Sequence, residues 1–347
     1  MRLERRTETP LALRIAAPLA ALGFTLVVTS LLVAWAGAPV GRAYALLLAG
    51  GFGSGFAWAE TLTRATPLIF TGLAAAVAFR ARLFNIGGEG QLYAGALAAV
   101  AVGTAFDAPP ALLWPAVWAA AALAGALLLL GPALLKQRFG VDEVVTTLLL
   151  NFIVLLFVSA MLDGPMKDPA AMGWPQSAAL PDALQLDKLV PRSRVHTGLL
   201  GALAAALALS LLLRFTTSGF EIRAVGANPR AAAFAGMPVG WVTVKVALLS
   251  GALAGLAGAV EVAGRTAYVT LDMSPGYGYT GIVVAMLAML EPLAVVAAAV
   301  FVAGMLVGAD GMSRAVGVPT YIADVIVAVA LLAMLVATLF TQYRWRR

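Results

Sequence analysis

Apolar stretches long enough to cross a lipid bilayer follow one another along most of the chain. A spanning helix needs roughly 17–25 mostly apolar residues, because the hydrocarbon layer is about 30 Å thick. With that window the sequence predicts about ten helices, at residues 15–36, 66–83, 88–106, 112–135, 144–162, 197–213, 241–264, 276–290, 293–309 and 321–341. We therefore expect an all-α integral membrane protein with a single transmembrane domain over residues 1–347.

The segment 43–58 is apolar, but it is short and interrupted by glycines. It is typical of a re-entrant or interfacial piece, and if it crossed the membrane the number of spans would become odd. With an even number of spans, most of the 23 Lys and Arg residues fall in segments on the side of the N-terminus. Basic residues collect in cytoplasmic loops, so both termini are expected in the cytoplasm.

Two connections are much longer than the others. Residues 163–196 are rich in proline and mixed in charge, and the expected topology places them outside the cell. Residues 214–240 fall inside and contain a short amphipathic run that Pro229 can start at its first turn. Loops of this length in a compact protein are often functional.

Small residues recur at helical spacing in two of the predicted spans. The patterns are Gly251-x-x-x-Gly255 and Gly304-x-x-x-Gly308. In lipid such patterns let two helices pack backbone to backbone. We expect helix packing, rather than solute contact, at these positions.

Composition narrows the functional classes. The chain is 62% hydrophobic and 12% charged, against roughly 45–50% and about 25% in ordinary soluble domains, which excludes a soluble enzyme and a nucleic-acid reader. With no cysteine and one histidine, the sequence predicts no metal site. None of its lysines stands in a Walker A loop, which holds nucleotide phosphates in ATPases. The chain is therefore expected to be no enzyme and to hold no cofactor of its own.

The most unusual short stretch is 84–95, where Asn85, Glu89 and Gln91 are interspersed with glycines between two apolar runs. A broken helix frees backbone amides and carbonyls to line a cavity, so these residues are candidates for a solute path. The alternative is a tight cytoplasmic turn whose polar side chains cap helices. The residues alone favour neither interpretation.

Three further polar side chains are candidates for the same path. Asn151 lies in an otherwise apolar run, and a buried amide needs a partner on another helix, in water or in a solute. Contact between helices is an equally good interpretation of this residue. Tyr277 and Tyr279 could stack on a base, whereas tyrosines more commonly anchor helices at the membrane interface.

The depth at which carboxylates lie in the predicted spans helps to decide whether an ion gradient drives transport. Four of them lie close to predicted helix ends: Glu89, Glu261, Glu291 and Asp324. Carriers driven by an ion gradient usually bury carboxylates at mid-depth. The positions favour side chains that face headgroups or water, with Glu89 as the exception. An ion-coupled secondary transporter of a small polar solute remains the alternative function.

Several stretches, ordered along residues 60–340, carry a family resemblance. They are Pro67–Leu73, Ala78–Arg80, Leu83–Gln91, Val141–Asn151, Arg223–Gly236 and Ser274–Ile282. These stretches resemble the permease subunits of bacterial ABC importers for nucleosides and simple sugars, in the branched-chain amino acid and ribose-type permease superfamily. Arg82 departs from the pattern, because many relatives have a small residue such as glycine there.

The resemblance implies a permease that moves a nucleoside or a related sugar-containing solute into the cell by alternating access. It implies a location in the bacterial inner membrane and a separate ATPase subunit that uses ATP and Mg²⁺. A second related permease, which makes a heterodimer, and an extracellular substrate-binding lipoprotein are the other protein partners. Membrane lipid surrounds the chain, and no nucleic acid is expected.

Segment 214–240 resembles the coupling helix with which such permeases dock on their ATPase. Small alanines would allow close docking, and the arginines could contact an acidic surface. The residues implied are Arg223, Gly226, Asn228, Pro229, Arg230, Ala231, Ala232 and Gly236. Without the resemblance, an ordinary basic cytoplasmic loop is the better explanation of the segment.

Overall fold

The computed structural model describes residues 2–5, 11–317, 321–322, 325, 328–329, 332–333, 336–337 and 343–346. The chain divides into two compact units, residues 1–61 with 301–347, and residues 62–300. The division falls inside α3 (Gly55–Arg80) and inside α12 (Pro292–Val316), and each unit is described by itself. A single transmembrane domain over residues 1–347 stays a prediction.

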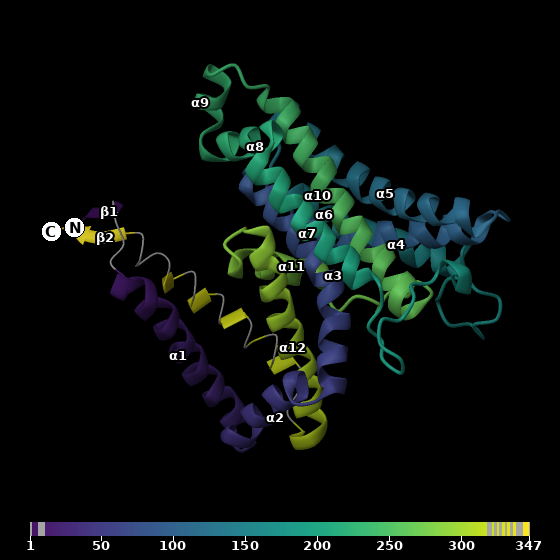
Figure 1. The fold of residues 1–347 in the computed structure, drawn as a ribbon, viewed down its shortest axis with the longest axis horizontal. Helices are drawn as coiled ribbons and strands as arrows, with labels where there is room; N and C mark the ends of the chain where they lie inside the picture. Colours follow the sequence, from purple (N-terminus) through teal and green to yellow (C-terminus); the bar gives the residue numbers. More distant parts are fainter. Residues whose placement is uncertain are drawn as a thin grey trace. The chain divides into compact units, whose positions relative to one another are not determined.

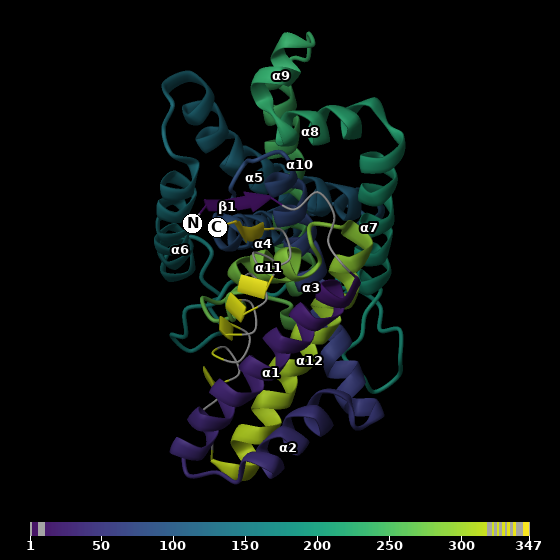
Figure 2. The same ribbon diagram turned by 90° about the vertical axis from the view of Figure 1, so that its left-hand side faces the viewer.

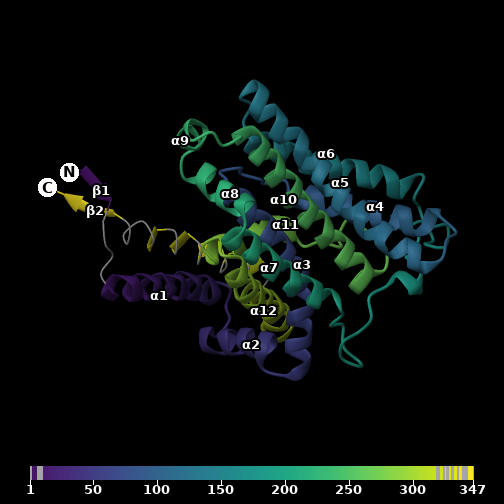
Figure 3. The same cartoon turned by 45° about the horizontal axis from the view of Figure 1, so that its top comes forward.

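The unit of residues 62–300 is built from helices (Figure 1). Besides most of α3 it contains α4 (Gly88–Ala105), α5 (Pro110–Phe139), α6 (Glu143–Asp163), η1 (Asp182–Leu184), α7 (Gly198–Phe215), α8 (Thr217–Ala227), α9 (Pro229–Phe234), α10 (Val239–Glu261), η2 (Val262–Thr266) and α11 (Tyr277–Leu287). The η2 segment is one turn of π-helix that continues α10. The centre of this unit is α10, which packs against α4 and α5 (Figure 3).

Glycines allow these three helices to touch at their backbones. A Cβ on Gly125 would lie 2.2 Å from the carbonyl oxygen of Gly251. A Cβ on Gly255 would lie 2.1 Å from the carbonyl oxygen of Ala121, and one on Gly258 would lie 1.9 Å from that of Leu92. No side chain fits at such distances, so the sequence prediction that Gly251 and Gly255 serve helix packing is confirmed.

The other unit contains α1 (Leu11–Trp35) and α2 (Val40–Phe52), and the axis turns by 111° between residues 23–35 and α2 (Figure 2). Gly308 of α12 contacts α2 directly, because a Cβ there would lie 1.9 Å from the carbonyl oxygen of Leu47. The second glycine pattern thus packs helices too. Two short strands, β1 (Arg2–Arg5) and β2 (Tyr343–Arg346), pair antiparallel in this unit.

Six helices of the described residues are long and apolar enough to cross a membrane, and a seventh span results if the bent α1–α2 pair counts as one. The six are α3, α5, α6, α7, α10 with η2, and α12. The predicted helices 88–106 and 276–290 appear as α4 and the shorter α11. The predicted helix 321–341 and Asp324 lie largely outside the described residues. Ten spans and cytoplasmic termini therefore stay predictions.

Candidate functional site

The segment 214–240 folds into α8 and α9, and local caps explain where each helix begins. The Thr216 hydroxyl accepts a hydrogen bond from the Gly219 amide at 3.0 Å at the start of α8. The Asn228 side chain accepts from the amides of Arg230 and Ala231 at 3.1 and 3.2 Å. Asparagine at this capping position followed by proline is a strong helix start, so the short helix predicted from Pro229 is confirmed.

The end of α8 is fastened to the end of α3. A Cβ on Gly226 would lie 1.8 Å from the carbonyl oxygen of Arg80, so the two backbones touch. The Arg82 guanidinium donates to the carbonyl oxygen of Ala227 at 3.0 Å. Arg82 itself has φ 57°, a left-handed conformation that glycine adopts without strain. That conformation explains why a small residue is suited to this position.

The small residues expected to allow docking do not all lie on the exposed face of α9. Ala232 is buried, with 4% of its surface exposed, so it faces its own chain. Arg230 and Ala231 are exposed, as are Arg223 on α8 and Gly236 beyond α9. Phe234 is 97% exposed at the end of the helix, more than Phe215 at 79% and Phe220 at 56% in the same segment.

Asn85 and Gln91 form a buried amide pair. Each side chain donates one hydrogen bond to the other, and both bonds are 2.9 Å long. Asn85 also donates to the Ser250 hydroxyl of α10 at 3.1 Å, and Ser250 donates to the carbonyl oxygen of Ala74 in α3 at 2.8 Å. The turn before α4 is thus joined to two other helices through polar contacts.

Asn151 of α6 joins the same turn from another side. Its amide nitrogen donates to the carbonyl oxygen of Ile86 at 2.9 Å and to the Tyr279 hydroxyl at 3.0 Å. Its oxygen accepts from the Gly90 amide at 2.8 Å. Gly90 lies in the first turn of α4, where backbone amides have no partner within the helix. Asn151 therefore caps α4 from α6.

Glu89 lies against the beginning of α11. Its carboxylate accepts from the Gly278 amide at 2.6 Å, and the side chain is buried. Next to it, the Thr71 hydroxyl of α3 donates to the carbonyl oxygen of Tyr277, whose ring is also buried. Glu89 thus joins the first turns of α4 and α11.

The structure brings the predicted path residues to one junction, around the beginnings of α4 and α11. They are Asn85, Glu89, Gln91, Asn151, Tyr277 and Tyr279. All except Tyr279, which is 37% exposed, are buried. Protein groups satisfy the hydrogen bonds described above, which is the requirement for buried polar groups. Contact with a solute stays a prediction for each of them.

Two acidic residues have environments that the sequence did not reveal. Glu261 is 1% exposed and forms an ion pair with Arg265 one turn later, so the expectation that it faces headgroups or water is wrong. Glu291 is partly exposed, accepts from the Arg80 guanidinium at 2.8 Å and lies 3.7 Å from Arg214. The hydrogen bond from Arg80 lowers the pKa of the Glu291 carboxyl.

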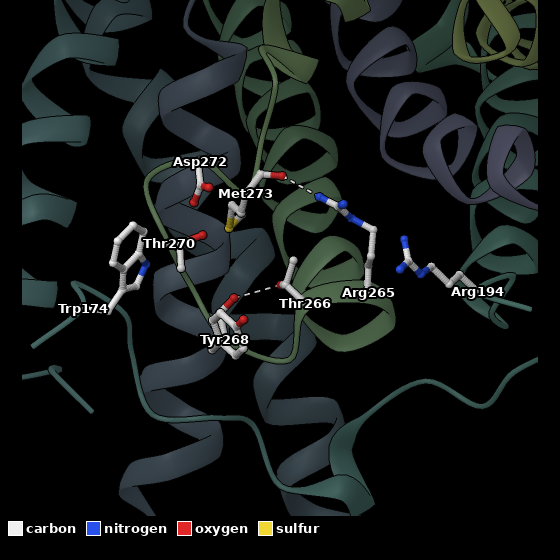
Figure 4. Close-up of a pocket in the computed structure, with 8 residues that line it drawn as sticks. All are labelled: Trp174, Arg194, Arg265, Thr266, Tyr268, Thr270, Asp272 and Met273. Atoms are coloured by element: carbon white, nitrogen blue, oxygen red, sulfur yellow. Dashed lines mark hydrogen bonds between the residues drawn. The ribbon is translucent and has the colours of Figure 1, made fainter. Parts of the chain in front are cut away.

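A cavity of about 370 Å³ opens at the far end of α10, past η2 (Figure 4). Its lining consists of Trp174, Arg194, Arg265, Thr266, Tyr268, Thr270, Asp272 and Met273. The long connection before α7 builds one wall, because it runs along residues 263–269. The amides of Ser177, Leu180 and Leu186 donate to carbonyl oxygens in that stretch at 2.7–3.1 Å.

Side chains of residues 265–273 are held by their own contacts. The Arg265 guanidinium donates to the carbonyl oxygen of Met273 at 2.9 Å, in addition to its ion pair with Glu261. The Thr266 hydroxyl donates to the carbonyl oxygen of Tyr268 at 2.8 Å, and Figure 4 shows both bonds. These contacts connect the side chains of Arg265 and Thr266 to the backbone of residues 268–273.

Residues 57–335 match the family described as the permease component of the branched-chain amino acid transport system. The chain belongs to this family. It is 39% identical over 318 residues to the guanosine ABC transporter permease protein NupP of Bacillus subtilis, which covers 91% of each chain. It is 38% identical over 312 residues to the glucose ABC transporter permease protein TsgB13 of Haloferax volcanii, covering 87% of this chain and 82% of that one.

A third relative of this permease is the nucleoside ABC transporter permease protein NupB of Lactococcus lactis. The two are 33% identical over 294 residues, which is 82% of this chain and 80% of the other. As a member of this family the chain is a transport component rather than an enzyme. Among the residues that the structure describes, no three histidine or acidic side chains gather where they could hold a metal ion.

Sequence reasoning missed several polar and aromatic residues of this permease. Ser250 looks like one more small residue of a packed helix, and only the fold brings it to Asn85. Glu143 is buried, accepts from the Phe84 amide at 3.3 Å and forms an ion pair with Lys136. Trp174 could have been chosen from the sequence as a binding residue, because it places a large ring in a long loop. Exposed aromatic residues on loops often belong to binding surfaces.

Proposed function

We propose that this chain is the membrane-spanning subunit of an ATP-binding-cassette importer that moves a nucleoside or a related sugar-containing solute into the cell by alternating access. The observation that carries the proposal is the match to a guanosine permease along 91% of both chains. Because the chain belongs to a permease family and its relatives are ABC transporter permeases, the proposal takes ATP rather than an ion gradient as the energy source.

The proposal includes the partners that such a subunit needs. A separate ATPase binds ATP with Mg²⁺ and supplies the energy. A second related permease, in a heterodimer, completes the pathway, and a substrate-binding lipoprotein delivers the solute from outside. The chain lies in the bacterial inner membrane, surrounded by lipid. The protruding α8–α9 segment, with Arg223 and Arg230 exposed, supports the ATPase contact.

The proposed orientation puts α9 in the cytoplasm and the cavity outside, within a protein of about ten spans. Helix α10 has 23 residues, so it is about 35 Å long, enough to cross a hydrocarbon layer of about 30 Å. Its beginning follows α9 and its end leads into the cavity wall. Arg80, Arg82 and Arg214 gather near α8, as expected of a cytoplasmic side.

Phe234 is the side chain with which we test coupling. Phe234→Ala removes a ring that is 97% exposed, and surface substitutions change folding stability by no more than about 0.5 kcal/mol. If the ring fills a pocket of the ATPase, its loss costs at least about 2 kcal/mol of binding, as for other interface anchors. We expect normal permease in the membrane, loss of the ATPase on purification, and strongly reduced nucleoside uptake.

Phe106→Ala is the matched control, because Phe106 is 62% exposed and follows the end of α4 away from α8 and α9. It should keep both the ATPase and uptake. The assay is co-purification of the ATPase from cells that express all subunits, together with uptake of radiolabelled guanosine. Retention of the ATPase and of uptake by Phe234→Ala would remove α9 as the coupling element. Failure of the wild-type complex to take up any nucleoside would overturn the substrate assignment.

A further inference from the structure

The relatives leave the solute open, since the name of one specifies guanosine at 39% identity and that of another specifies glucose at 38%. The cavity past η2 distinguishes these chemistries. We infer that it is an external receiving site for an uncharged nucleoside, whose base stacks on Trp174 and Tyr268. This inference rests on the proposed function and deepens it.

Aromatic rings are the first argument. Trp174 comes from the long connection before α7 and Tyr268 from the stretch after η2, so two distant segments bring rings to one cavity (Figure 4). Trp174 is 62% exposed, which leaves a large flat surface available to a ligand. Any nucleobase can stack on such a ring, because every base has a flat aromatic face. A free hexose has no aromatic face and can pack only its C–H groups against such rings.

Charge balance is the second argument. The lining carries two guanidinium groups, Arg194 and Arg265, and the carboxylate of Asp272. Arg265 already forms an ion pair with Glu261, and Arg194 also has an interaction partner, so neither guanidinium of the lining is left without one. Such a lining favours a neutral solute over an anion. Asp272 can accept hydrogen bonds from ribose hydroxyls, whereas it would repel a phosphate.

Size and location agree with this assignment. About 370 Å³ lies within the range of about 300–1,000 Å³ for small-molecule pockets. The cavity wall also leads directly to the buried junction, because the Tyr93 hydroxyl donates to the carbonyl oxygen of Leu271 at 2.6 Å and accepts from the Ser274 amide at 3.3 Å. Three residues further on, Tyr277 begins α11. The chain segment that lines the cavity therefore continues into the junction that holds the predicted path residues.

The experiment measures direct binding to the assembled permease complex in lipid nanodiscs, without the binding protein. The probes are radiolabelled guanosine, glucose and guanosine 5′-monophosphate, in equilibrium dialysis. The variants are Trp174→Ala and Trp174→Phe, and Met172→Ala is the control, because Met172 is fully exposed on the same connection and does not line the cavity. Uptake of guanosine by cells that express the complete importer is measured in parallel.

The expected result is that wild type binds guanosine more tightly than either glucose or the monophosphate. Trp174→Ala should weaken guanosine binding at least about tenfold, which is within the range for loss of one base stack. Trp174→Phe should retain most of the affinity, and Met172→Ala all of it.

Guanosine binding that is unchanged in Trp174→Ala, or absent from a complex that still transports guanosine, overturns the receiving site and leaves the proposed function intact. Tighter binding of glucose or of the monophosphate overturns the assignment to a neutral nucleoside. Absence of both binding and uptake in wild type counts against the proposed nucleoside function itself.

Discussion

Asn151→Leu removes the cap that α6 supplies to α4 while keeping a side chain of similar volume. The asparagine makes three hydrogen bonds, to Ile86, Tyr279 and Gly90, and it is completely buried. Leucine can make none of them. The backbone groups of Ile86 and Gly90 would then lose this partner in the interior of the protein.

The magnitude follows from those contacts. Hydrogen bonds between membrane helices average about 0.6 kcal/mol each, so three of them amount to about 2 kcal/mol. A buried backbone group left without a partner costs about 1–3 kcal/mol, and two such groups raise the expected loss to about 3 kcal/mol or more. At about 2–4 °C per kcal/mol for a chain somewhat smaller than this one, the melting temperature Tm should fall by at least about 6 °C.

Two further variants separate the cap from other effects. Tyr279→Phe removes one hydroxyl and leaves both backbone contacts of Asn151, so its Tm should fall by about 2 °C or less. Phe152→Leu changes a neighbouring side chain that is 57% exposed, and its Tm should stay close to that of wild type. Thermal unfolding of each purified variant, followed by loss of the monodisperse peak on size exclusion, gives the three values.

A Tm of Asn151→Leu within about 2 °C of wild type would refute the capping role. If uptake were nevertheless lost, the residue would belong to the solute path, as one interpretation of the sequence holds. A lowered Tm with normal uptake at low temperature would identify Asn151 as a contact between helices only.

Two other predictions follow from contacts described by the structure. Gly125→Val places a Cβ 2.2 Å from the carbonyl oxygen of Gly251 and should abolish monodisperse protein, whereas Gly131→Val on the same helix meets open space and should purify normally; equal yields would contradict the backbone contact. His196 is buried with no hydrogen-bond partner for either ring nitrogen among the described residues, and burial lowers its pKa to about 4, below the value of about 6.5 in an unfolded chain. Between these two pKa values the unfolded chain binds more protons than the folded one, so the free energy of unfolding should fall by about 3 kcal/mol at most as the pH drops from 6.5 to 4. His196→Gln should therefore flatten the dependence of Tm on pH between 7.5 and 5. An unchanged slope would exclude His196 as the cause of that dependence.

Sequence periodicity placed α5, α6 and α10 to within a few residues, but α3 (Gly55–Arg80) begins eleven residues before the predicted start at residue 66. The runs at 112–135 and 144–162 became α5 and α6, with Asp142 capping α6 and Gly140 ending α5 in a left-handed conformation. The pairing of Asn85 with Ser250 could not be predicted, since 165 positions separate them and only packing of α10 brings them together. The inward orientation of Ala232 depends in the same way on contacts beyond its own helix.

The glycine contacts that join α10 to α4 and α5 have a mechanical consequence. A helix whose carbonyl oxygens touch the neighbouring backbone cannot slide, because a shift of one residue, about 1.5 Å, would force a side chain into a space that holds only Gly251, Gly255 or Gly258. The three helices must then tilt as one stiff lever. Because α10 begins just after α9 and ends at η2, a displacement of α9 by the proposed ATPase would be transmitted along these packed helices to the wall that carries Tyr268.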